Sequence, residues 1–348
     1  MFEPQFTTTH AITSGLTIIE RTRGFLDAAT LSDAWVERMS QQALLLEAHH
    51  TTHIEGTHFS VEQSAEIWAG RTVAGSDADD VRELLNYRRA FDLVREYLVS
   101  GAPVSELVIR EIHKHLVTGV RQDNAQPGQY RLVQNYVANG ETGKVVFMPP
   151  PAVAVAGLMR ELVQWLRQEE DIHPVLVAGI AQFQLVHIHP FVDGNGRASR
   201  LLSTLCLYRT GYDFRRLFTL SAYYDRDRPS FYSALRRVEQ GQMDLTPWLE
   251  FFVKGLSTQL LEVKQIGEQA IKMEVAAKAV GLNSRQTSLL AAFSANNHLS
   301  MANCAALGEG NSRRTLQRDF KRLLEAKFIE IVGRGSTDPT KYYRLKDS

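Results

Sequence analysis

The residue types best suited to phosphate chemistry lie in one segment, residues 189–200, which reads His-Pro-Phe-Val-Asp-Gly-Asn-Gly-Arg-Ala-Ser-Arg. His189 can accept a proton from a hydroxyl group, and Asp193 is a hard oxygen ligand suited to Mg²⁺. The Gly-Asn-Gly turn precedes a helical run, so its backbone N–H groups and the helix dipole can bind an anion. Arg197 and Arg200 are three residues apart and share a helix face, which suits phosphate binding.

This segment resembles the signature of the Fic (Fido) family, His-x-Phe-x-(Asp/Glu)-Gly-Asn-Gly-Arg-x-x-Arg, and matches it at every fixed position. The resemblance implies transfer of AMP from ATP to a Tyr, Thr or Ser hydroxyl of a protein, with Mg²⁺ as cofactor. It implies that His189 is the general base, that Phe191 anchors the loop and that Asp193 binds the metal ion. Glycine at position 196 goes with AMP transfer, whereas family members with lysine there phosphorylate. The ATP-binding residues of this motif would be Gly194, Asn195, Gly196, Arg197, Ala198, Ser199 and Arg200.

A second motif precedes the first in the chain. Residues 51–56 read Thr-Thr-His-Ile-Glu-Gly, which resembles the inhibitory pattern (Ser/Thr)-x-x-x-Glu-(Gly/Asn) of one Fic subclass. Thr51 and Glu55 are four residues apart and project from one helix face, and Gly56 suits the left-handed position that ends a helix. The resemblance implies that Glu55 pairs with Arg200 where the γ-phosphate of ATP would bind, so the enzyme is autoinhibited. The alternative is an ordinary salt bridge at a helix end.

The segment 136–148 predicts a β-hairpin, because β-forming residues flank an Asn-Gly turn. In the Fic family such a hairpin, called the flap, covers the active site and docks the target segment by strand addition. Gly-Gln-Tyr-Arg at 128–131 resembles the lead-in to the flap. The alternative is a plain surface hairpin. The target-docking residues predicted here are Val145, Val146, Phe147 and Met148.

The nucleobase pocket is harder to predict. Phe231 and Tyr232 stand where relatives place an aromatic pair near adenine and ribose, and Glu239 stands where some relatives have asparagine. Aromatic residues at helical spacing are more often core residues than ligand contacts, so only Tyr232 is assigned to ATP. His187 is two residues from His189 and cannot share a helix face with it, which favours a structural role.

Three further histidines, His49, His50 and His53, lie beside Glu55 in the sequence and could make inhibition sensitive to pH. We interpret them as solvated residues on the face of a helix.

Composition favours a globular cytoplasmic enzyme. The 348 residues are 44% hydrophobic, and 39 basic residues balance 39 acidic ones, which gives no net field to attract nucleic acid. Cys206 and Cys304 are predicted to be buried free thiols in a reducing compartment. The N-terminus lacks a basic start followed by an apolar run, and no stretch approaches 18 apolar residues. Neither a signal peptide nor a membrane partner is therefore expected.

The periodicity along the chain predicts a mainly α fold, a Fic helical bundle with a small β-hairpin flap, followed by a winged helix-turn-helix domain. The expected catalytic domain covers residues 1–256, including an inhibitory helix at about 40–56. A connecting helix is expected over 257–282 and the C-terminal domain over 283–348.

The C-terminal domain resembles a winged helix. Helices are expected over 286–294 and 301–307, then a basic recognition-type helix from 311, and finally two strands around a wing that carries Arg334. Residues 283–348 hold eleven Lys or Arg against six Asp or Glu. This local excess permits DNA binding, although winged helices also dock proteins or dimerise. The candidate DNA contacts are Arg313, Arg314 and Arg318.

Three functions remain open on the sequence alone. The first is an autoinhibited protein adenylyltransferase that acts on another protein or on itself. The second is a DNA-binding regulator whose Fic domain senses nucleotide. The third is a de-AMPylating hydrolase in which Glu55 orients a water molecule, and its residues are those of the first. A homodimer is compatible with all three.

Overall fold

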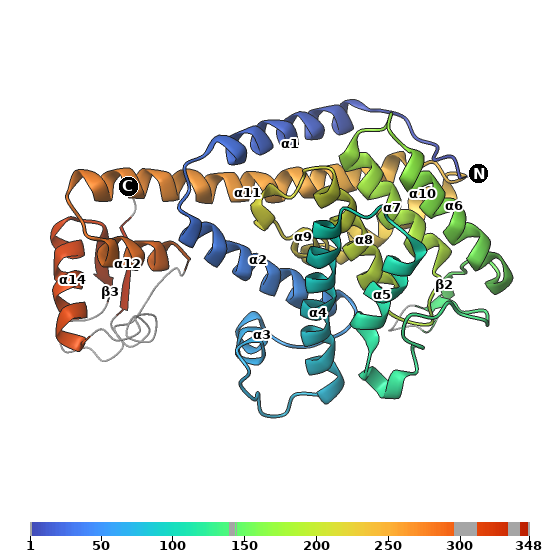
Figure 1. Ribbon diagram of the computed structural model, residues 1–348, viewed down its shortest axis with the longest axis horizontal. Helices are drawn as coiled ribbons and strands as arrows, with labels where there is room; N and C mark the ends of the chain where they lie inside the picture. Colours follow the sequence, from blue (N-terminus) through green and yellow to red (C-terminus); the bar gives the residue numbers. More distant parts are fainter. Residues whose placement is uncertain (1, 139–142, 144, 296–311, 333–341, 347–348) are drawn as a thin grey trace. The chain divides into compact units, whose positions relative to one another are not determined.

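The computed structural model describes residues 2–138, 143, 145–295, 312–332 and 342–346, and these residues are mainly helical (Figure 1). The chain divides into two units. The first consists of Met1–Asp27 and Ser40–Leu261, and the second of Ala28–Met39 and Glu262–Ser348. Two long helices, α2 (Asp33–Ile54) and α11 (Thr246–Ala279), contribute to both units.

The sequence prediction had a separate connecting helix over 257–282 and assigned residues 28–39 to the catalytic domain. In the structure α11 is a single helix of 34 residues that begins with Thr246-Pro247. Proline suits the first turn of a helix, and no Gly-Pro break follows it, so the helix continues without interruption.

The remaining helices of the first unit surround the site segment 189–200 (Figure 1). They are α1 (His10–Ala28), α3 (Val61–Trp68), α4 (Ala78–Ser100), α5 (Glu106–Val117), α6 (Val155–Gln168), α7 (Pro174–Ile188), α8 (Asn195–Arg209), α9 (Leu220–Arg226) and α10 (Arg228–Gln240), with short 3₁₀ turns at Val120–Asp123, Ala152–Ala154 and Phe214–Arg216.

Helix α7 lies at the centre of the first unit because it is apolar around its whole circumference. It packs along α8, and α8 in turn packs on α4 and α5. Gly179 allows α11 to approach α7 closely, since a Cβ atom there would lie only 3.0 Å from the ring of Phe252. The indole N–H of Trp248 donates to the carbonyl oxygen of Gly179 at 2.8 Å. The two ends of the 189–200 segment are therefore held by the two most buried helices of the unit.

Helix α3 begins directly after Ser60. The Ser60 hydroxyl accepts a hydrogen bond from the Gln63 backbone N–H, and the Gln63 side chain accepts one from the Ser60 N–H, which completes a capping box before α3.

The flap is a short antiparallel hairpin of β1 (Val137–Ala138) and β2 (Val145–Phe147). Val137 pairs with Phe147 and Ala138 with Val145, and the register shifts between these two pairs. The predicted Asn-Gly turn at 139–140 lies outside the described residues.

The second unit contains α12 (Ser284–Ala295), α14 (Arg313–Glu325) and an antiparallel pair of strands, β3 (Ile329–Val332) and β4 (Tyr342–Leu345). Its core is apolar and includes Leu289, Phe293, Phe320 and Tyr343. The predicted helix over 301–307 and Arg334 lie outside the described residues, so the winged helix stays a prediction.

Arg314 and Arg318 are exposed on α14, and Arg313 is the first residue of that helix. Cys206 is a buried free thiol as predicted, and burial raises its pKa to about 12, whereas Cys304 lies outside the described residues. Among the helices that the structure describes, none is long and apolar enough to cross a membrane.

Candidate active site

The 189–200 segment forms a tight loop between α7 and α8. It leaves α7 through His189, whose φ of 51° is left-handed, and enters α8 after Gly194, whose φ is 76°. A Cβ atom at Gly194 would also lie 2.8 Å from the side chain of Val117, so both conformation and space require glycine there. The Asn195 side chain accepts from the N–H of Phe191 and donates to its carbonyl oxygen, both at 2.9 Å. The loop is thus closed by its own residues.

His189 is placed to act as a base. Its Nδ1 atom lies 3.1 Å from the carbonyl oxygen of Val186, so Nδ1–H donates there and Nε2 is left as the acceptor. Burial lowers the pKa of His189, the largest effect on this ring, which keeps the imidazole neutral at neutral pH. A neutral, oriented imidazole is the form that accepts a proton.

The loop is anchored on a histidine that the sequence reasoning missed. The rings of Phe191 and His113 stack with their centroids 3.7 Å apart, and Phe191 is fully buried. The Nε2 atom of His113 lies 2.9 Å from the carbonyl oxygen of Asp193, while its Nδ1 atom accepts from the N–H of Gly128 at 3.0 Å. His113 is therefore a neutral Nε2–H tautomer that joins α5, the lead-in to the flap and the active-site loop.

We expect His113 to make folding less favourable in acid. Burial lowers its pKa from 6.5 to about 4, so between these values the unfolded chain binds a proton that the folded chain does not. As the pH falls from 6.5 towards 4, this difference in proton binding lowers the free energy of unfolding by about 3 kcal/mol in all. The free energy of unfolding, measured with denaturant at several pH values in this range, gives the number of protons taken up on unfolding from its slope against pH. We expect this number to be smaller by about one in His113→Asn than in wild type.

Burial also lowers the pKa of His49 to about 4, so His49 contributes to the pH dependence of unfolding in the same range. The free energy of unfolding of His113→Asn will therefore still change with pH. An unchanged slope in His113→Asn would contradict the assignment of a neutral His113.

Arg200 is held by the inhibitory motif. The guanidinium is 4% exposed; its Nε donates to the Thr51 hydroxyl at 2.6 Å, and its Nη2 donates to the Glu55 carboxylate at 2.6 Å and to the Thr51 carbonyl at 3.1 Å. α2 ends at Ile54, and Gly56 follows with a φ of 111°. The structure therefore places Glu55 against the arginine that the family resemblance assigns to phosphate.

Gly196 makes room for this contact. A Cβ atom at position 196 would collide with the Glu55 carboxylate and lie 3.2 Å from the Arg200 guanidinium. Ala198 and Ser199, also predicted to contact ATP, turn their side chains into the core, where the Ser199 hydroxyl donates to the Gly196 carbonyl at 2.8 Å.

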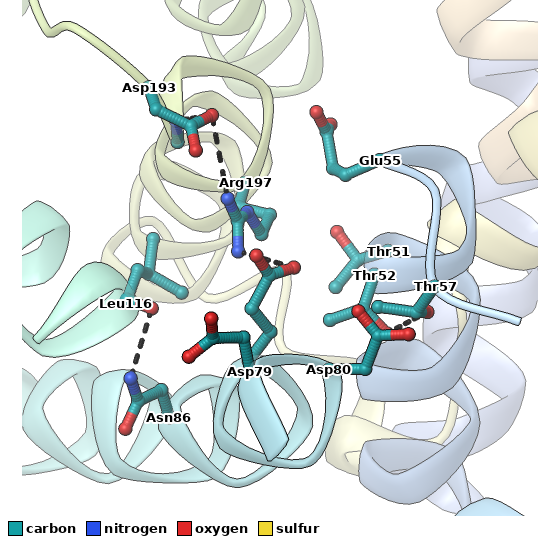
Figure 2. A network of polar contacts seen from close by, with 12 residues as sticks. Thr51, Thr52, Glu55, Thr57, Asp79, Asp80, Asn86, Leu116, Asp193 and Arg197 are labelled. Carbon is teal, nitrogen blue, oxygen red and sulfur yellow. Dashed lines mark hydrogen bonds and ion pairs between the residues drawn. The ribbon is translucent and has the colours of Figure 1, made fainter. Parts of the chain in front are cut away.

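Arg197, Asp193 and two residues missed by the sequence reasoning form a cluster of four charges. Figure 2 shows the contact between Arg197 and Asp193 in this cluster. Glu83 of α4 and Arg197 are each 1% exposed, and Arg197 Nη1 lies 2.9 Å from Glu83 Oε2. Arg121 bridges Glu83 at 3.3 Å and Asp193 at 3.1 Å. Burial raises the pKa of Glu83, while both arginines oppose that effect.

A cavity under the flap brings His189, Glu55 and Arg200 together, whereas Asp193 and Arg197 do not line it. Phe231 belongs to the core, since it is 4% exposed and stacks on Tyr224 with a centroid distance of 4.6 Å, while Tyr232 is 40% exposed. Val145 and Met148 are exposed at the outer part of the flap. The cavity lining includes Glu55, Val146, Phe147, His189, Gly196, Arg200, Tyr232 and Glu239.

Arg131 ties the flap to the active-site loop. It is 1% exposed, its backbone N–H donates to the Pro190 carbonyl at 2.9 Å, and its Nε donates to the His189 carbonyl at 2.8 Å. Its Nη2 donates to the Pro150 carbonyl at 2.5 Å, at the end of the flap. One arginine thus fixes the base of the flap relative to His189.

The interpretation of the histidines on α2 as solvated is wrong. His49 is 5% exposed, and its Nδ1 lies 2.9 Å from the Ser64 hydroxyl. His50 and His53 each place Nδ1 2.8 Å from the same Asp225 oxygen. The sequence alone did not show that α9 brings a carboxylate to this face of α2.

The comparisons with known proteins agree with this geometry. Residues 103–207 match the Fic/DOC family. The chain is 30% identical over 239 residues to the protein adenylyltransferase Fic of Drosophila grimshawi, which covers 68% of this chain and 46% of that protein. It is 31% identical over 236 residues to that of Drosophila ananassae, covering 67% and 44%. The chain thus spans just under half the length of these curated relatives.

Two crystal structures show the same fold. A Fic family protein from Desulfovibrio desulfuricans has a TM-score of 0.67 at 23% identity, covering 100% of this chain and 99% of that one. Fic-1 from C. elegans has a TM-score of 0.62 at 24% identity, covering 76% and 73%. Residues 103–207 therefore form a Fic domain, and the fold of the chain is similar to that of these two structures.

Proposed function

We propose that the chain is an autoinhibited protein adenylyltransferase, which transfers AMP from ATP to a hydroxyl group of a protein. The observation that carries the proposal is the cavity under the flap, where a neutral His189, the start of α8 and Arg200 meet, with Glu55 seated on Arg200. The curated relatives that match two-thirds of the chain are protein adenylyltransferases by name, which supports the same reaction.

In the proposed reaction the flap holds a target segment so that its Tyr, Thr or Ser hydroxyl faces His189. Nε2 of His189 takes the hydroxyl proton, and the freed oxygen attacks the α-phosphorus of ATP. The bond between the α-phosphorus and the bridging oxygen breaks, and diphosphate leaves. Most of the acceleration comes from alignment and from neutralising negative charge, because the protein forms no covalent bond itself.

The phosphate end of the site fits Mg²⁺. Asp193 offers a carboxylate whose side chain is 42% exposed beside the start of α8. Among the described residues no three His, Cys, Asp or Glu side chains converge, so phosphate oxygens and water would complete the ligand set, as Mg²⁺ prefers. When bound, the ion would neutralise charge on the phosphates.

Inhibition follows from the state of Arg200. Its guanidinium is already engaged by Glu55 and Thr51, so a γ-phosphate would have to displace a carboxylate to reach it. ATP then lacks the contact that would align its α-phosphorus with the target oxygen. Removing Glu55 leaves the Thr51 contacts, which keep Arg200 in place.

Other assignments remain predictions. De-AMPylation would use the same His189 and Glu55, and duplex DNA binding would use Arg313, Arg314 and Arg318. A homodimer, self-modification and a cytoplasmic location are likewise compatible with the proposal.

The position of the label from ATP tests the reaction class. The Glu55→Gly variant is incubated with Mg²⁺ and ATP carrying its label on either the α- or the γ-phosphate, alone and with cell lysate. We expect protein to retain the α-label, because AMP is transferred, and the γ-label to leave as diphosphate. Protein that retains the γ-label would contradict AMP transfer and indicate phosphorylation.

A further inference from the structure

We propose that Glu83 is a positioning residue for nucleotide binding, acting through Arg197. The proposal rests on the proposed function, because it takes the phosphates of ATP to be the ligands of Arg197. Glu83 does not belong to either sequence motif: it lies on α4, more than a hundred residues before Arg197 on α8.

The contact between Glu83 and Arg197 is fully removed from solvent. Both residues are 1% exposed, and the ion pair spans 2.9 Å between Oε2 and Nη1. Neither Nε nor Nη1 of Arg197 makes a hydrogen bond within the described residues, so the contact with Glu83 is an ion pair without hydrogen-bond geometry. A buried guanidinium needs a counter-charge, and Glu83 is the carboxylate nearest to it, since Asp193 is 3.7 Å from Nη2.

Arg121 contacts both Glu83 and Asp193 and so links the buried ion pair to Asp193. Its side chain is 54% exposed, and it contacts Glu83 Oε1 at 3.3 Å and Asp193 Oδ2 at 3.1 Å. Asp193 Oδ1 also accepts from the Gly194 N–H at 2.6 Å. Two carboxylates and two guanidiniums therefore alternate around the phosphate end of the site.

Because the charges alternate, each of the two guanidiniums, those of Arg197 and Arg121, lies near both carboxylates. Glu83 holds Arg197 through Nη1, so Arg197 does not close fully onto Asp193. Without the charge of Glu83, both Arg197 and Arg121 would have only Asp193 to neutralise them in this cluster. The carboxylate proposed to hold Mg²⁺ would then be covered by two arginines, and the guanidinium proposed to hold phosphate would be misplaced.

Glu83 and Glu55 thus have opposite effects although each pairs with a motif arginine. Glu55 is 27% exposed at the end of α2, on the cavity under the flap, and its contact competes with a phosphate. Glu83 is 1% exposed in the second turn of α4, so a ligand cannot displace it. Removing the charge of Glu55 should favour ATP binding, and removing that of Glu83 should weaken it.

A double-mutant cycle tests the proposal. Mg·ATP affinity is measured by titration calorimetry for Glu55→Gly and for the same protein carrying Glu83→Gln, Arg197→Gln or both. We expect Glu83→Gln and Arg197→Gln each to weaken binding by about 10- to 100-fold. The double substitution should be no more than about twofold weaker than Arg197→Gln, because Glu83 acts through that residue.

The controls separate positioning from a general structural role. Asp92→Asn removes an exposed carboxylate from the same helix, where it pairs with Arg95 at 3.7 Å, and should leave affinity unchanged. If Glu83→Gln alone fails to fold, the comparison of Arg197→Gln with the double substitution still decides, because the double substitution removes both charges of the buried pair. Unchanged affinity in Glu83→Gln, or losses that multiply in the double variant, would overturn the proposal.

The readout also separates this proposal from the proposed function. If Glu55→Gly binds Mg·ATP but transfers no AMP, adenylyl transfer is wrong while the cycle still reports on Glu83. If transfer occurs and the cycle shows no coupling, only the role of Glu83 is wrong.

Discussion

Glu55→Gly is expected to raise the rate of AMP transfer by about 10- to 150-fold. The substitution removes a charge-assisted contact of 2.6 Å to a guanidinium that is 4% exposed. Such a contact is worth about 1.5–3 kcal/mol, and each 1.4 kcal/mol corresponds to about tenfold. ATP no longer has to displace the carboxylate, while both Thr51 contacts still orient Arg200.

The measurement is the initial rate of α-label incorporation at fixed Mg·ATP. Glu55→Gln keeps the shape of the side chain without its charge and should give an intermediate rate. Glu62→Gln, at an exposed carboxylate that accepts from Ser60, is the matched control and should behave as wild type. Equal rates in wild type and Glu55→Gly would show that the contact seen here does not limit the reaction.

His189→Ala is expected to lower AMP transfer by about 10²- to 10⁴-fold, the usual contribution of a general base. The imidazole is half-buried, neutral and oriented by the Val186 carbonyl, and it lines the same cavity as Arg200. Mg·ATP affinity should change little, because the phosphates are assigned to the start of α8 and its arginines.

Transfer is best measured in the Glu55→Gly background, where the starting rate is high, with affinity measured separately by calorimetry. His10→Ala, at an exposed histidine of α1, is the matched control. If His189→Ala retains AMP transfer, His189 is not the general base, and the proposed mechanism has no acceptor for the hydroxyl proton.

The sequence predicted the parts of the site that depend on local spacing. The Gly-Asn-Gly turn at the start of α8 and the shared direction of Thr51 and Glu55 at the C-terminal end of α2 both follow from residues close together in the chain. The helical fold and the flap followed from periodicity and from β-forming residues around a turn.

The missed residues all act across long separations in the chain. Glu83 and His113 carry no local signature, and Arg131 was recognised only as part of the lead-in to the flap. Their roles appear only when α4, α5 and this lead-in meet the loop after α7. The histidines of α2 were misinterpreted for the same reason, since Asp225 is more than 170 residues away from them. Alternating charges around Asp193 are a property of the tertiary structure alone.

Intact mass after incubation with Mg·ATP tests the central claim most directly, on wild type, Glu55→Gly and Glu55→Gly with His189→Ala. The proposed mechanism predicts an AMP adduct that is abundant in Glu55→Gly, scarce in wild type and absent from the double variant. An adduct of equal abundance in wild type and Glu55→Gly, or one that persists without His189, would contradict it.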